Sequence, residues 1–114
     1  MSGSIDKLTA NWTDERDGKQ KVEELKKEIL TRGAWTTIMY LIRELDSKTG
    51  QFGAPKIRIQ RYQKKGDSYM PRSKFTITNA KQAYQIMEIM KKWYPENPGA
   101  IEAAGESDSG SDSE

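Results

Sequence analysis

The fold is decided by the stretch PKIRIQRYQKKGDSYMPRSKFTITNAKQAYQIMEIMKKW, residues 55–93. In its first part, Ile57 and Ile59 alternate with charged and polar residues from Lys56 to Lys64. Because successive side chains of a strand point to opposite faces, this alternation predicts a half-buried strand with a cationic outer face. The turn Lys65-Gly66-Asp67 follows, and a further strand is expected over residues 68–78. Because Pro71 cannot donate a ladder hydrogen bond, this strand is expected to start at a sheet edge or to carry a bulge.

The stretch ends in a predicted helix over residues 80–94, which Thr78 or Asn79 would cap and Pro95 would end. Placed at helical spacing, its apolar residues span an arc of about 160°. One small sheet does not bury so wide an arc, so the helix is expected to pack against a second surface. The residues expected in that contact are Ile86, Ile89, Met90 and Trp93.

Upstream of this stretch the patterns change three times. Residues 34–45 (AWTTIMYLIREL) are rich in β-branched and aromatic residues and predict a strand, followed by a loop over residues 46–55. Val22, Leu25, Ile29 and Leu30 recur at helical spacing, so an additional helix is expected over residues 21–32, with Gly33 as its stop. Residues 1–18 show no sustained period and predict a flexible arm.

The charges of the chain are unevenly distributed. Its net charge of +2 includes an acidic, serine-rich segment, residues 99–114, with five acids and no base, which is expected to be disordered. Residues 1–98 therefore carry a net charge of +7, and residues 56–74 hold seven bases against Asp67 alone. Such a concentration of positive charge indicates a polyanionic partner, although a solvated surface is the plainer alternative.

The sequence lacks the residues and motifs on which several classes of protein function depend. The chain of 114 residues contains no Cys and no His, which removes the thiol nucleophile, the common metal ligand and the common neutral-pH base. No phosphate-binding glycine loop or metal-ligand motif is present. We therefore expect a protein that is not an enzyme and needs no cofactor or metal. The longest apolar run, residues 38–42, is too short to span a bilayer, so an intracellular protein without membrane contact is expected.

The succession of motifs resembles the positive cofactor four family of transcriptional coactivators. These motifs are Ile42-Arg43-Glu44 at a strand end, alternating aliphatics that end at Tyr62, a basic strand entry with Pro71, then Phe75-Thr76-Ile77 and an Asn-started helix. The resemblance covers about residues 34–94. It implies an α+β fold in which a curved antiparallel sheet of about four strands precedes a C-terminal helix. It also implies a homodimer through that helix and binding of single-stranded DNA.

Basic and aromatic side chains share the predicted strands, and this mixture suits phosphates and unpaired bases. By the resemblance, Arg43, Lys56, Arg72 and Lys74 match DNA-contacting positions. The family's aromatic after the strand tyrosine is Gln63 here, and its preceding arginine aligns with Gln60. The usual Gly before the last strand's aliphatic run is absent.

Trp35, Phe75, Trp93 and Tyr94 are expected in the core. The nucleic-acid-binding residues expected are Arg43, Lys56, Arg58, Arg61, Tyr62, Lys64, Tyr69, Arg72 and Lys74, with Tyr62, Tyr69 or Phe52 as the stacking ring.

The sequence thus predicts a domain over residues 19–98 that binds single-stranded DNA with little sequence preference, in replication, recombination or transcription. The acidic tail would cover the basic face, recruit replication or transcription proteins, or merely keep the protein in solution. Two alternatives remain open: a regulator whose basic sheet docks an acidic protein, and an RNA-binding module.

Overall fold

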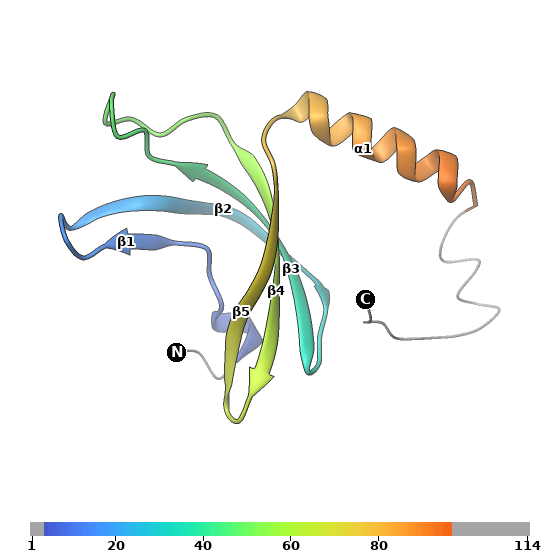
Figure 1. The fold of residues 1–114 in the computed structure, drawn as a ribbon, viewed down its shortest axis with the longest axis horizontal. Helices are drawn as coiled ribbons and strands as arrows, with labels where there is room; N and C mark the ends of the chain where they lie inside the picture. The colour runs from blue at the N-terminus through green and yellow to red at the C-terminus, as the bar shows by residue number, and fades with distance from the viewer. Residues whose placement is uncertain (1–3, 97–114) are drawn as a thin grey trace. The chain divides into compact units, whose positions relative to one another are not determined.

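A computed structural model describes residues 4–96 of the chain. It contains a short 3-10 helix η1 (Ile5–Lys7), five strands and one α-helix, in the order along the chain that Figure 1 shows. The strands are β1 (Trp12–Asp14), β2 (Lys19–Thr31), β3 (Trp35–Glu44), β4 (Lys56–Lys65) and β5 (Ser68–Ile77), and the helix is α1 (Ala80–Trp93). The chain divides after residue 80 into a sheet unit and a helix unit.

The five strands form one antiparallel sheet in which neighbours in sequence are neighbours in space, from β1 to β5. The strands are strongly twisted (Figure 1). Short turns join β1 to β2, β2 to β3 and β4 to β5, whereas a longer loop over residues 45–55 joins β3 to β4. Gly66 has a φ of 60° in the β4–β5 turn, a left-handed conformation that glycine adopts without steric cost. The α+β class, the antiparallel sheet and the C-terminal helix predicted from sequence are confirmed.

The core lies on one face of the sheet. Ile38, Tyr40 and Ile42, which alternate along β3, are fully buried there. We call this face the inner face, and the opposite face, which carries Trp35 and Met39, the outer face. The remaining buried hydrophobic residues of the inner-face cluster are Leu8, Ala10, Val22 and Tyr62.

The helix expected over residues 21–32 is wrong, because this segment is strand β2. Its register against β3 shifts between Glu24 and Lys26 and again between Ile29 and Thr31. The first bulge adds a residue to the alternation between Val22 and Ile29, so both face the core at a spacing of seven residues, which imitates a helix. Pairing along the whole of β3 overrides the helical propensity of the Glu, Lys and Leu residues.

The N-terminal residues were predicted to form a flexible arm. In the structure, the part from Ile5 to Asp14 packs onto the sheet and contributes to the core. Leu8 and Ala10 are buried in it. The ammonium of Lys27 donates to the carbonyl oxygens of Ile5, Asp6 and Leu8, at 3.3, 3.0 and 2.6 Å. Polar side chains of β2 thereby satisfy backbone groups that burial would otherwise leave unpaired. The acidic tail lies outside the described residues.

Candidate nucleic-acid interface

The β4–β5 hairpin carries most of the residues that the sequence nominates for binding, and its register sorts them between the two faces. Residues paired across antiparallel strands share a face. Arg58 pairs with Tyr40, and Gln60 pairs with Lys74, so these side chains belong to the inner face. Arg61 pairs with Thr37 and belongs to the outer face. The nominated residues therefore do not form one continuous surface.

Tyr62, nominated as an exposed stacking ring, lies in the core, with 6% of its surface exposed. Its hydroxyl is 2.7 Å from that of Tyr40, and the two are hydrogen-bonded. Burial raises the pKa of both phenols above the ordinary value, since it disfavours the charged form. Tyr69 is half-buried and packs against the same cluster. The predicted alternation of β4 is correct. The face that was predicted to be cationic and exposed, however, points toward the core at Gln60 and Tyr62, because the N-terminal residues cover it.

Three cations gather around one carboxylate on the inner face. Lys56 donates to Glu44 at 2.6 Å, and an Arg58 guanidinium nitrogen lies 3.6 Å from the same carboxylate. The hydrogen bond from Lys56 lowers the pKa of Glu44, and the charges of Lys56, Arg58 and Lys74 lower it further. The Arg58 Nε is buried and has no hydrogen-bond partner among the described residues. The cluster retains net positive charge, which suits an anion.

Two of the nominated arginines on the outer face lie over aromatic rings. Arg43 forms an ion pair with Glu23 and lies over the ring of Phe52, 5.0 Å from its centroid. Arg61 lies over the ring of Trp35, 4.4 Å from its centroid. Both arginines therefore make cation–π contacts, which guanidinium groups favour.

The ion pairs of the described residues are concentrated away from the hairpin. Outside it, basic residues pair with carboxylates as Arg16–Asp14, Lys21–Asp17, Arg32–Asp6, Arg43–Glu23 and Lys91–Glu88. Within the hairpin, only Lys56 and Arg58 have a carboxylate at ion-pair distance, and they share Glu44. Five hairpin cations have no such partner in residues 4–96: Arg61, Lys64, Lys65, Arg72 and Lys74.

Trp35 and Gln63 are functional candidates that the sequence reasoning did not nominate. The two residues pair directly across β3 and β4. Trp35, expected in the core, is 36% exposed, and Phe75, also expected there, is 54% exposed. Trp93 and Tyr94 are exposed as well. One feature of the sequence could have indicated that Trp35 is exposed. It directly follows the Gly33-Ala34 turn, and the first residue of a strand has few neighbours to cover it.

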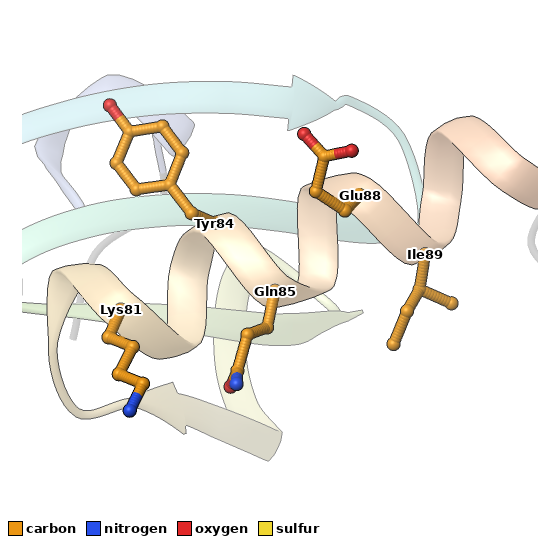
Figure 2. Close-up of a pocket in the computed structure, with 5 residues that line it drawn as sticks. All are labelled: Lys81, Tyr84, Gln85, Glu88 and Ile89. Atoms are coloured by element: carbon orange, nitrogen blue, oxygen red, sulfur yellow. The ribbon is translucent and has the colours of Figure 1, made fainter.

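The residues expected at a dimer interface lie along α1, which contains no buried residue. Ile86 is half-buried, while Ile89, Met90 and Trp93 are exposed. A shallow hollow runs along the same helix, lined by Lys81, Tyr84, Gln85, Glu88 and Ile89, whose side chains Figure 2 shows. Tyr84 and Glu88 point to one side of the helix there, and the other three point to the opposite side.

Residues 4–96 contain no group of three or more acidic, His or Cys side chains placed to hold a metal ion. Within the same residues, no helix has the length and apolarity that crossing a membrane requires. Comparisons with protein-family models, curated proteins and solved structures find no match for this chain.

Proposed function

We propose that this protein is a non-enzymatic, single-stranded-DNA-binding protein with little sequence preference, which acts in DNA replication, recombination or transcription. The observation that carries the proposal is the β4–β5 hairpin, where five cations have no carboxylate partner within residues 4–96, so that the hairpin is strongly positive. Phosphates neutralised by such residues release counterions, which gives affinity without regard to sequence.

The contact residues we propose are those that offer charge at the surface of the hairpin. Lys64, Arg72 and Lys74 are exposed, and Arg61 is half-buried. Lys56 and Arg58 would join them when a phosphate competes with Glu44. Arg43 is a weaker candidate because Glu23 already neutralises it. Tyr62 and Tyr69 support the sheet from its core.

The proposal is tested by fluorescence anisotropy with labelled oligonucleotides at several salt concentrations. The variant Lys64→Gln/Arg72→Gln/Lys74→Gln should weaken binding of every sequence and reduce the slope of log affinity against log salt by about 0.7 per lost phosphate contact. The matched control, Lys19→Gln/Lys26→Gln/Lys48→Gln, removes the same charge from exposed residues outside the hairpin. Equal losses in the two variants would show a response to net charge alone and would contradict a hairpin interface.

The same assay separates the alternatives. Oligomers of single-stranded DNA, duplex DNA and RNA are compared with an acidic peptide of equal charge. Preference for single-stranded DNA over the duplex is the expected result. Tighter binding of RNA, or of the acidic peptide, would overturn the proposal in favour of an RNA-binding module or a regulator that docks an acidic protein.

We further propose that the protein forms a homodimer through α1. This proposal is supported by Ile89, Met90 and Trp93, which are exposed on α1, because apolar patches of this kind mark association surfaces. In sedimentation velocity at tens of micromolar, the wild type should be dimeric and Met90→Glu monomeric. Gln85→Glu places the same charge at another exposed position of α1 and should remain dimeric. A monomeric wild type would rule the dimer out.

A further inference from the structure

The outer-face end of the β3–β4 pair combines an exposed indole with two arginines that have no carboxylate partner among the described residues. Trp35 is the first residue of β3 and pairs with Gln63, which pairs on its other side with Met70 of β5. Trp35 and Met70 are 36% and 39% exposed. The guanidinium of Arg61 lies over the Trp35 ring, and the Nε of Arg72 donates to the Gln63 Oε1 at 3.0 Å. These five residues are called the Trp35 patch.

The contacts inside the patch orient its groups. Arg61 holds the indole by a cation–π contact, while part of the surface of Trp35 stays accessible. An arginine side chain can only donate hydrogen bonds, so the atom of the Gln63 amide that accepts from Arg72 is its oxygen. The amide nitrogen of Gln63 therefore remains available as a donor beside the ring. The patch thus offers a flat aromatic surface, an amide donor and two cations.

These groups match the parts of an unpaired nucleotide. A base stacks on an accessible aromatic ring whatever its identity, and arginine contributes both charge and a planar surface. A purely apolar partner would leave the charges of Arg61 and Arg72 buried without carboxylates, at considerable cost. A nucleotide pairs those charges with its phosphates.

We propose that Trp35 is a stacking platform for one base of the bound strand, with Arg61 and Arg72 on the adjoining phosphates. This inference rests on the proposed function and names a specific subsite for it. It places the base contact on the outer face, at a residue other than Tyr62, Tyr69 and Phe52, which the sequence suggested as stacking rings.

The first test observes Trp35 itself. In the full chain with Trp12→Phe and Trp93→Phe, Trp35 is the sole tryptophan. Titration with oligothymidylate of about 15 nucleotides, within the usual range of single-strand site sizes, should quench its fluorescence. An abasic strand of equal length carries the phosphates without the bases and should quench it far less. Equal quenching by both strands, or none by either despite binding, would overturn the inference.

The second test compares affinities. Wild type should bind oligothymidylate more tightly than the abasic strand, by about 5- to 150-fold for one stacked base. Trp35→Ala should lose this preference, Trp35→Phe should keep part of it, and Trp12→Phe, a control at an exposed tryptophan in β1, should keep all of it. Arg61→Lys retains the charge but not the planar guanidinium group, and should reduce the preference while leaving the salt slope unchanged. If Trp35→Phe behaves like the wild type and Trp35→Ala keeps the preference, stacking at Trp35 is excluded.

The two proposals fail in different ways. If the wild type binds neither strand, the proposed function itself is wrong. If it binds both strands equally and the hairpin variant abolishes both, the function stands and the Trp35 subsite does not.

Discussion

At the scale of single residues, the two tyrosine hydroxyls of the core show how burial selects partners. Tyr40 is fully buried and Tyr62 nearly so, and each hydroxyl has the other as its hydrogen-bond partner. A buried hydroxyl without a partner costs free energy because it has given up water. The pair therefore explains why a polar atom is tolerated at the centre of this sheet.

We expect Tyr62→Phe to lower the free energy of unfolding by about 1–3 kcal/mol, since it leaves the Tyr40 hydroxyl buried and unpaired. Urea denaturation followed by circular dichroism measures the change. Adding Tyr40→Phe should restore part of the loss because no lone hydroxyl remains. Tyr84→Phe removes an exposed hydroxyl and serves as the control. A wild-type midpoint for Tyr62→Phe would show that the hydroxyl pair contributes nothing.

Glu44 makes stability depend on acid pH. Lys56 lowers its pKa in the folded state, so the ionised form is favoured by folding. A carboxylate of this kind contributes stability above its unfolded pKa of about 4.3, and the contribution is lost as the pH falls through the lower folded pKa.

Glu44→Gln should therefore destabilise the protein at pH 7 and not at a pH below the folded pKa of Glu44. Its side chain is 39% exposed, so the loss should be about 0.2–1 kcal/mol, as for exposed ion pairs. Urea midpoints measured from pH 7 downward give the profile. Glu28→Gln, at an exposed position of β2, should show no comparable pH dependence. An unchanged profile for Glu44→Gln would contradict this account.

At the scale of elements, β2 connects the N-terminal residues to the sheet. Lys27 donates to three of their carbonyl oxygens, and the Glu24 carboxylate accepts from the Thr9 hydroxyl and the Ala10 amide, at 2.7 and 3.1 Å. The two side chains bind the same segment with opposite charges. They hold Leu8 and Ala10 over the inner face.

Lys27→Met keeps the aliphatic stem and removes the donors, so it should release the segment before β1. We expect trypsin to cleave at Lys7 faster in this variant, and the free energy of unfolding to fall by about 1–3 kcal/mol because carbonyls are left unpaired. Limited proteolysis with mass spectrometry locates the cuts. Lys26→Met changes an exposed neighbour and should be cut like the wild type. Cleavage at equal rates would show that packing alone holds the segment.

At the scale of the whole molecule, opposite charges are separated along the chain. Residues 1–98 carry a net charge of +7, and the five acids of residues 99–114 reduce it to +2. An acidic segment tethered to a basic domain competes with nucleic acid for the same cations, and salt screens this competition. We propose that the tail also recruits replication or transcription proteins with basic surfaces.

Truncation after residue 98 should tighten binding of single-stranded DNA at low salt and change it little at high salt. Anisotropy titrations at two ionic strengths measure the difference. A full-length control with the five acids changed to their amides should behave like the truncation, because charge and not length is responsible. An affinity that does not change on truncation at low salt would contradict this competition and leave the tail as a solubilising segment or a site that recruits a partner protein.

Local patterns in the sequence determined three elements of this protein. Ile57 and Ile59 alternate without interruption in β4, Gly66 supplies the turn, and the helical spacing of Ile86, Ile89 and Trp93 extends through α1. These patterns depend on near neighbours in the chain, which are visible in the sequence itself. The charge excess of the hairpin was likewise present in its composition.

Tertiary structure decided which face of the sheet became the core, and with it the location of the candidate site. The polar face of β4 turned inward at Tyr62 because Tyr40 and the N-terminal residues, distant in sequence, satisfy and cover it. Bulges let β2 pair with β3 against its helical pattern. Trp35 became a candidate only through Arg61 and Gln63 on the neighbouring strand. Long-range pairing supplies these contacts, and its energy exceeds the local preferences that sequence patterns express.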